Sequence, residues 1–224
     1  MLIRSWNVYH GRSHPAGRRG YLEQAVRLAT ADRPDVLCLQ ELPLWSIRRL
    51  ACWSGMQVFA ARTRPAPLGM LAGRALTDLH HGLLRSAFSG QANAILVQPQ
   101  LQAGDLGHVR VSRRGEHARA CQAVRVDDRL VVANLHLSGA AAEEETAAAL
   151  AWLDGRLRAG EPLVLAGDFN ARLELPGFSA PGAGVDHILV RGAVATPLAT
   201  WPLERRRHNG VVLSDHAPVE LTLP

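Results

Sequence analysis

The sequence predicts an α/β domain in which helices cover the outer faces of β-sheets. Two observations support this prediction. Short β-branched or leucine-rich runs alternate with segments of three-to-four-residue apolar spacing, and the runs Leu130–Leu137 and Leu163–Leu165 are almost continuously apolar. Strands that are covered on both faces have this continuous pattern. With 224 residues, 47% of them hydrophobic and 20% charged, the chain is expected to form one domain over residues 1–224.

The individual elements follow from the same patterns, taken in chain order. Strands are expected at Leu2–Tyr9, Val36–Glu41, Gln57–Arg62, Ala92–Gln98, Gly107–Arg113, Gln122–Val126, Leu130–Leu137, Leu163–Asp168, Val185–Val190 and Ala217–Leu223. Helices are expected at Gly20–Ala31, Leu44–Trp53, Leu68–Phe88 and Ala140–Arg158. The last of these is rich in Ala, Glu and Leu, which are good helix formers.

Composition limits the class of protein. No apolar run approaches the roughly 20 residues of a transmembrane helix, and the N-terminus MLIRSWNVYHGR lacks the order of a signal peptide. A cytoplasmic protein without a membrane anchor is therefore expected, and nothing in the sequence identifies a protein partner. Cys38, Cys52 and Cys121 have no metal-type spacing, so they are interpreted as reduced packing residues.

The basic residues are all arginine, since the chain has 25 arginines and no lysine. Guanidinium groups suit phosphate recognition, but the codon bias of a GC-rich genome explains the missing lysine better. The net charge of +5 still favours a polyanionic partner such as nucleic acid. The densest basic run, Arg205, Arg206 and Arg207, is either a solvated loop or a loop that contacts substrate phosphates.

Polar side chains stand at or just beyond the ends of predicted strands. They are Asn7 in SWNVYHG, Gln40 and Glu41 in LCLQELP, Asn134 and His136 in VVANLHLSG, Asp168 and Asn170 in LVLAGDFNA, Asp186 and His187 in VDHILV, and Asp215 and His216 in LSDHAPVELTL. Each alone has a structural explanation, such as an Asx-turn or a satisfied core histidine. Together they place acidic groups where a core strand would prefer Val or Leu, and buried carboxylates need a cation. Oxygen and imidazole ligands without a thiolate cluster favour magnesium, calcium or manganese over zinc.

These motifs resemble those of the endonuclease/exonuclease/phosphatase family, a deoxyribonuclease-like superfamily of metal-dependent phosphoesterases. The segments WNVYHG, LCLQE, GQANAILV, VVANLHLSG, LVLAGDFNA, GVDHILV and LSDHAPVEL match the family's motif series in order, across nearly the whole chain. The resemblance implies a four-layer α/β sandwich, in which two central mixed β-sheets are flanked by helices. It also implies a site for Mg²⁺, or Mn²⁺, at one rim of the sandwich.

The resemblance assigns the metal to three of the polar residues. It implies that Glu41 is the main metal ligand and that Asn7 helps to bind the metal or the phosphate. Asp215 would be a second carboxylate on the metal side or a hydrogen-bonding group. Asn93, in GQANAILV, would either brace the site or contact the substrate.

The resemblance also implies catalytic roles for five residues. Asp168 would orient or deprotonate the attacking water, and Asn170 would hold that water or the phosphate in line. His136 and His216 would donate hydrogen bonds to phosphate oxygens in the transition state. Asp186 would hold His216 in its tautomer and orientation, although the two residues lie 30 positions apart.

The function expected from the resemblance is divalent-metal-dependent phosphodiester hydrolysis, carried out by a nuclease that cleaves DNA or RNA. The alternative is a phosphatase or phosphodiesterase that acts on a small-molecule or lipid phosphoester. A catalytically inactive binding module would require lost catalytic positions, and none is lost. Only 17 residues separate Asp168 from Asp186, a stretch that is longer and aromatic-rich in the family's abasic-site endonucleases, which argues against that repair activity.

Overall fold

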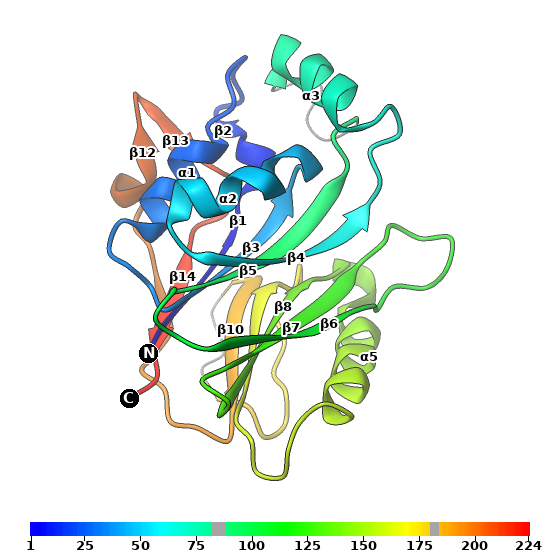
Figure 1. The fold of residues 1–224 in the computed structure, drawn as a ribbon, viewed down its shortest axis with the longest axis vertical. Helices are drawn as coiled ribbons and strands as arrows, with labels where there is room; N and C mark the ends of the chain where they lie inside the picture. The colour runs from blue at the N-terminus through cyan, green and yellow to red at the C-terminus, as the bar shows by residue number, and fades with distance from the viewer. Residues whose placement is uncertain (82–87, 180–183) are drawn as a thin grey trace.

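Two stacked β-sheets form the centre of the protein in a computed structural model that describes residues 1–81, 88–179 and 184–224. Figure 1 shows α1 (Leu22–Thr30) and α2 (Ile47–Ser54) on the outer face of one sheet and α5 (Ala142–Asp154) on the outer face of the other. The order is helix, sheet, sheet, helix. This arrangement confirms the expected four-layer α/β sandwich.

The larger sheet has six strands in the order β11-β14-β1-β3-β5-β4. Their bounds are β1 Leu2–Asn7, β3 Val36–Leu42, β4 Gln57–Arg64, β5 Gln91–Val97, β11 Ala199–Thr200 and β14 Val219–Thr222. The pair β1 and β3 is parallel, and the other neighbouring strands are antiparallel. The sheet is therefore mixed, as expected.

The smaller central sheet has five strands in the order β10-β9-β8-β7-β6. Their bounds are β6 Ala103–Arg110, β7 Ala120–Val126, β8 Leu130–His136, β9 Leu163–Asp168 and β10 Asp186–Arg191. Here β8 and β9 form the one parallel pair, since the other neighbours are antiparallel. Both central sheets thus have a parallel pair whose strands end at the same rim.

Shorter elements surround these layers. Helix α3 covers Met70–Leu79, and a small three-stranded sheet joins β2 (Ser13–His14), β13 (Val211–Leu213) and β12 (Arg207–His208). Short 3₁₀ helices lie at Tyr9–Gly11, Leu44–Ser46, Gly139–Ala141 and Leu203–Arg206. In the part of the chain that the structure describes, no helix is both long and apolar enough to cross a membrane.

Three apolar clusters fill the three interfaces between the four layers, and the strands of the central sheets contribute to two of them at once. In β3, Leu37 and Leu39 pack with α1 and α2, while Val36 and Cys38 pack between the sheets. Side chains of a strand alternate between its faces, so a strand that is buried on both faces must be apolar at every position. This is the physical reason for the continuous apolar runs in the sequence.

The face between the two sheets changes from apolar to polar along each strand toward one rim. In β1 this face carries Ile3, whose side chain lies in the apolar cluster, then Ser5, and last Asn7. In β8 it carries Val132, Asn134 and His136, as expected for positions two residues apart. The middle positions, Ser5 and Asn134, both accept a hydrogen bond from Gln40, at Ser5 Oγ (3.1 Å) and Asn134 Oδ1 (2.8 Å), as expected for a buried amide. The last positions, Asn7 and His136, belong to the site described below.

Several predicted element boundaries are wrong, and two of the errors have a clear local cause. Strand β1 stops at Asn7 because Tyr9 and His10 adopt left-handed backbone conformations that turn the chain. The predicted strand Gly107–Arg113 is instead β6, Ala103–Arg110. Because β6 lies at the edge of its sheet, its first residues are exposed or half-buried, and Gly104 and Asp105 interrupt the apolar signal there.

Two further predictions are only partly met. The predicted helix Leu68–Phe88 is confirmed as α3 over Met70–Leu79, where extended backbone at His80 ends it, and its residues 82–87 lie outside the described residues. Of the three cysteines, Cys38 and Cys121 are buried, whereas Cys52 is exposed and is not a packing residue.

Candidate active site

The ends of five strands place acidic, amide and imidazole groups together at one rim of the two central sheets. The parallel register sets Asn7 beside Gln40, and in the facing sheet His136 lies beside Asp168. The antiparallel neighbour β10 sets Asp186 opposite Asp168. The two sheets then meet through a hydrogen bond of 2.8 Å from Asn7 Nδ2 to Asp168 Oδ2.

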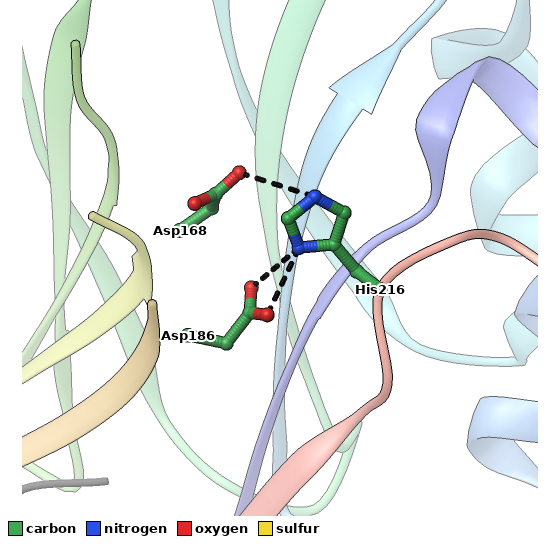
Figure 2. A group of neighbouring side chains, drawn as sticks. All are labelled: Asp168, Asp186 and His216. Carbon is green, nitrogen blue, oxygen red and sulfur yellow. Dashed lines mark hydrogen bonds and ion pairs between the residues drawn. The ribbon is translucent and has the colours of Figure 1, made fainter. Parts of the chain in front are cut away.

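His216 lies between two aspartates, as Figure 2 shows. Its Nδ1 is 2.9 Å from Asp186 Oδ2 and 3.1 Å from Asp186 Oδ1, and its Nε2 is 3.8 Å from Asp168 Oδ2. The pair expected from positions 30 residues apart is therefore present. Burial disfavours a charged ring here, but the hydrogen bond and the charge of Asp186, together with Asp168 and Asp215, outweigh it and raise the pKa of His216 to about 9. The ring is thus positively charged at neutral pH.

Asp168 is almost completely buried and is held by two donors. Its Oδ2 accepts from Asn7 and its Oδ1 accepts from the backbone N–H of Asn170 (2.9 Å). Burial and the nearby charge of Asp186 raise the pKa of Asp168 to about 6, although His216 and both hydrogen bonds act in the opposite direction. A carboxylate with a pKa near neutrality can take a proton from water more readily than an ordinary aspartate.

His136 lies between the two acidic parts of the rim. Its Nε2 is 3.7 Å from Asp168 Oδ2 and 3.7 Å from Glu41 Oε1, and it accepts a hydrogen bond of 2.6 Å from Arg119 Nη1. Burial and the positive charge of Arg119 lower the pKa of His136 to about 3. The ring is therefore neutral at neutral pH, and Arg119 supplies the positive charge at this position.

Glu41 lies beside His136 at the rim, with its Oε1 3.7 Å from His136 Nε2. Its Oε2 is 3.2 Å from Nε2 of the buried His10, and its side chain is 19% exposed. Burial favours the neutral acid, but a hydrogen bond and electrostatic attraction from His10, together with His136 and Asn7, lower the pKa of Glu41 to about 2. Glu41 is therefore ionised over the whole physiological range.

Non-glycine residues with left-handed backbone cluster around this rim. They are Tyr9 (φ 47°), His10 (φ 55°), Glu41 (φ 56°), Asn170 (φ 52°) and Ser214 (φ 62°). Such conformations cost about 1–3 kcal/mol each and persist only where the surroundings impose them, which happens often at functional sites. At Glu41 the cause is visible, because the pairing of β3 with β5 shifts register between Leu39 and Leu42 and turns the carboxylate toward the rim.

The donor groups fit a hard divalent cation at Glu41. The carboxylate is ionised and partly exposed, and carboxylate oxygens are ligands that magnesium and manganese accept. Asn7 turns its Nδ2 to Asp168, and its Oδ1 accepts from the backbone N–H of Tyr9 (2.9 Å). A second group, Asp168, Asp186 and His216, has ligand atoms within 4.8 Å of one another. There the charged His216 already compensates part of the negative charge of the two aspartates, so Glu41 is the more suitable metal ligand.

The loop that carries His216 is fixed by contacts at its backbone. Ser214 Oγ donates to Asn7 O (2.7 Å) and accepts from the His216 N–H (3.1 Å). Trp6 Nε1 donates to His216 O (3.0 Å), and Arg206 Nη1 donates to both Ser214 O and His216 O (3.0 Å each). Arg206, expected to contact substrate, thus supports the backbone of this loop.

The other two arginines of the basic run differ from each other. Arg205 pairs with Asp32 (2.8 Å) and Glu220 (3.1 Å), and its guanidinium lies 3.6 Å from the ring centre of Trp201. Arg207 begins β12 and is exposed. The segment is therefore one turn of 3₁₀ helix followed by a short strand rather than a simple loop, and two of its three arginines make contacts within the protein.

The remaining predicted site residues lie at different depths. Asn170 is exposed, and its Nδ2 donates to Leu137 O (2.9 Å). Asp215 is exposed on the His216 side of the rim, where its Oδ1 accepts from Ser214 Oγ (3.4 Å). Asn93 is completely buried, and its amide has no hydrogen-bond partner among the described residues, so no contact shows it bracing the site.

Two residues of the rim were missed by the sequence reasoning. His10 follows the WN motif by only three positions and belongs to the matched segment WNVYHG, which was a usable signal. Arg119 lies in an arginine-rich loop between β6 and β7 and carries no local signal, because only the pairing of β7 with β8 brings it to His136.

Comparisons with known proteins identify the family and the fold of this chain. A family model described as "Endonuclease/Exonuclease/phosphatase family" matches residues 5–216. No curated protein matches the chain in sequence. The endonuclease/exonuclease/phosphatase of Beutenbergia cavernae has a similar structure (TM-score 0.69, 17% identity, 100% of this chain and 71% of that chain).

Two other solved structures share the fold over the whole chain. The mannosyl-6-phosphatase of Bacteroides thetaiotaomicron has a TM-score of 0.68 and 14% identity, and the comparison covers 100% of this chain and 99% of that chain. The human nocturnin catalytic domain, solved with a bound sulfate anion, has a TM-score of 0.64 and 15% identity over 100% of this chain and 93% of that chain. From the family match and this fold, the chain belongs to the endonuclease/exonuclease/phosphatase family, whose members are phosphoesterase hydrolases that generally depend on a divalent metal.

Proposed function

We propose that the protein is a divalent-metal-dependent phosphodiester hydrolase and that its substrate is nucleic acid. The observation that carries this proposal is the convergence of Glu41, Asp168 and the Asp186–His216 pair at one rim. This arrangement combines an ionised carboxylate for a metal, a carboxyl group with a pKa near neutrality and a charged imidazole.

Each of these groups suits one requirement of phosphoester hydrolysis. Mg²⁺ or Mn²⁺ at Glu41 and Asn7 would neutralise negative charge on the phosphate. Asp168 orients the attacking water and accepts a proton from it as the water attacks phosphorus. The contacts of Asp168 with Asn7 and the Asn170 N–H fix the orientation of its carboxylate. His216, held by Asp186, donates from Nε2 to a phosphate oxygen as charge builds there.

His136 and Arg119 are proposed to act together. Because Arg119 donates to His136 Nε2, a phosphate at this position would meet the guanidinium as well as the ring. A guanidinium can give two parallel hydrogen bonds to phosphate oxygens. Asn170 and Asp215, both exposed beside the site, remain candidates for holding the substrate and for supporting the metal.

The substrate class is supported less strongly than the reaction. The net charge of +5 favours a polyanion, but Arg205 and Arg206 make contacts within the protein and do not add to that argument. A small-molecule or lipid phosphoester is the second candidate, supported by the fold shared with a mannosyl-6-phosphatase. An inactive binding module is the least favoured, because every matched catalytic position is filled. A cytoplasmic location stays a prediction.

The test is a panel of single-stranded and duplex DNA, RNA, nucleotides, sugar phosphates and phospholipids with Mg²⁺ or Mn²⁺. Cleavage of nucleic acid at low enzyme concentration, with log affinity falling by about 0.9 per decade of salt for each duplex phosphate contacted, supports the nuclease. Efficient turnover of small esters with a salt slope near zero supports the second candidate. Lack of hydrolysis of any class by folded, metal-loaded protein would contradict the proposal.

A further inference from the structure

A small pocket adjoins the site on the Glu41 side, away from His216. Its volume is about 200 Å³, and it is lined by His10, Glu41, Arg64, Gln91, His117 and Arg119. None of Asp168, Asp186 and His216 lines it. The pocket therefore shares Glu41 and Arg119 with the site but lies apart from Asp168 and the Asp186–His216 pair, which are proposed to act on the attacked phosphate.

Strand geometry holds the two arginines of this pocket. Arg64 ends β4 and pairs with Gln91, the first residue of β5, after a register shift at Arg62. Such irregularities re-aim side chains and are common beside active sites. Arg119 comes from the other sheet, where its backbone N–H donates to Ser112 Oγ (3.0 Å) and its Nη1 donates to His136. The guanidiniums thus enter the pocket from both sheets.

A larger groove, lined by other residues of the β6–β7 loop, has a different charge. This groove, about 760 Å³, is lined by Arg113 and Arg172 but also by Glu116, Glu143 and Glu144. It adjoins Asn170, because a Cβ on Gly139, one of its lining residues, would lie 2.7 Å from Asn170 O. Three carboxylates against two guanidiniums make this side unsuitable for a second phosphate.

We propose that the pocket beside Glu41 binds a second phosphate of the substrate, so that the enzyme prefers phosphoesters that carry a terminal phosphate near the phosphate under attack. This inference deepens the proposed function and rests on it. Two guanidiniums from opposite sides suit a phosphate dianion, and the volume is below that of sites for drug-sized ligands, so the pocket suits a phosphate group rather than a nucleoside. The chemistry is shared by a phosphorylated end of a nucleic acid and by a small bisphosphate.

The experiment compares substrates that differ only in this phosphate. One arm uses an oligonucleotide of one sequence with a 5′-phosphate, with a 3′-phosphate or with two hydroxyl ends. The other arm uses adenosine 3′,5′-bisphosphate and adenosine monophosphate. The expected result is a preference of about tenfold to a hundredfold in kcat/KM for the terminal phosphate, expressed mainly in KM, since charge-assisted contacts are being added. The arm in which the terminal phosphate raises kcat/KM shows whether the second phosphate belongs to a nucleic-acid end or to a small bisphosphate.

Two variants of the pocket and one control locate the effect. Arg64→Gln should remove most of the preference, and His117→Ala should reduce it less, because His117 is exposed. Arg113→Gln, on the acidic side of the same loop, should keep the preference. Circular dichroism of each variant confirms folding. An Arg64→Gln variant that loses activity equally on both members of a pair would show that the pocket holds the attacked phosphate itself, and would overturn the proposal.

Binding gives a second measurement that does not depend on turnover. Calorimetry on Asp168→Asn protein with Mg²⁺ should show the bisphosphate binding at least tenfold more tightly than the monophosphate, and Arg64→Gln should remove this difference. Hydrolysis without a preference for the terminal phosphate, together with equal binding of the bisphosphate and the monophosphate, would disprove the second-phosphate site while leaving the proposed hydrolase function intact. Lack of hydrolysis together with selective binding would disprove the proposed function while leaving the phosphate pocket intact.

Discussion

The layer between the two central sheets has two ends that are made by the same strands but differ in chemistry. At one end Ile95, Val132 and their neighbours are completely buried among other apolar side chains. At the other end the same face carries Asp168, buried to the same degree, and the partly exposed Glu41. The apolar end lowers the free energy of the folded state, whereas the polar end raises it by burying charge and straining the backbone.

This difference indicates that stability and reactivity are separated along each strand. Buried carboxylates and left-handed residues are tolerated at the rim because the apolar end holds the strands in register. Variants at the two ends should therefore fail in different ways, and four predictions test this, starting from the largest effect.

Removal of the divalent metal should abolish hydrolysis while leaving the fold intact. The rim would lose the cation at Glu41, but the apolar end would be unchanged. Mass action at a hundredfold excess of metal contributes only about 2.7 kcal/mol, so the thermal midpoint should fall by no more than about 10 °C. Activity and thermal unfolding with chelator, and after return of Mg²⁺ or Mn²⁺, measure both effects.

Glu41→Gln is the matched variant for metal removal, because it keeps the side-chain volume and removes the charge. It should weaken metal binding more than it weakens the fold. Full turnover by chelator-treated wild-type protein, or an unchanged metal requirement in Glu41→Gln, would move the ligand role to another residue.

Loss of the His216 side chain should lower kcat by roughly a hundredfold to a thousandfold, the range for one preorganised hydrogen-bond donor. His216→Ala removes the ring, and Asp186→Asn removes the carboxylate 2.9 Å from Nδ1 that keeps the ring charged and oriented. Because the two residues act as a unit, the double variant should be little worse than His216→Ala alone. Single-variant losses that multiply would show independent action.

Truncation at the apolar end should change stability and not chemistry. Ile95→Ala should lower the free energy of unfolding by about 2–5 kcal/mol, because it leaves a cavity between the sheets. Leu71→Ala, on the exposed side of α3, is the control and should change it by no more than about 0.5 kcal/mol. Denaturant unfolding measures both. An altered metal affinity in folded Ile95→Ala protein would show that the two ends are not separated.

The smallest expected effect is a gain in stability from the loss of a catalytic group. The pKa of Asp168 is about 6 in the folded protein against an ordinary value of 3.8, so the folded state binds the proton more tightly. The stability that the folded state gains by binding this proton is therefore lost as the pH rises from about 4 to 6. Asp168→Asn should remove this loss and raise the free energy of unfolding at pH 7 by up to about 3 kcal/mol in metal-free protein.

The pH dependence of the gain shows whether it comes from removing the charge of Asp168 or from a change in packing. The gain in Asp168→Asn should disappear below pH 4, and the exposed Asp154→Asn should show none. Denaturant unfolding at pH 4, 5, 6 and 7 provides the measurement. A gain that is equal at pH 4 and pH 7 would assign it to packing rather than to the charge.

Most of the layered fold could be predicted because it depends on patterns that are local in the chain. Continuous apolar runs such as Leu130–Leu137 identify strands covered on both faces, and polar interruptions such as His136 mark where those runs reach the rim. Edge strands carry less of this signal, which explains the misplaced β6. The candidate residues Glu41, Asp168 and His216 were likewise visible, because each stands at or beside the end of an apolar segment.

By itself the sequence determined which residues are available, whereas only the tertiary structure decided which of them meet. Arg205 and Arg207 look alike in the chain and are both exposed, yet Arg205 pairs with Asp32 and Glu220, whereas Arg207 makes no salt bridge among the described residues. Arg119 has no local signal, yet the pairing of β7 with β8 brings it to the site. The physical reason is that electrostatic and hydrogen-bond energies depend on distance and burial, and in a sandwich these are set by strand pairing between segments far apart in the chain.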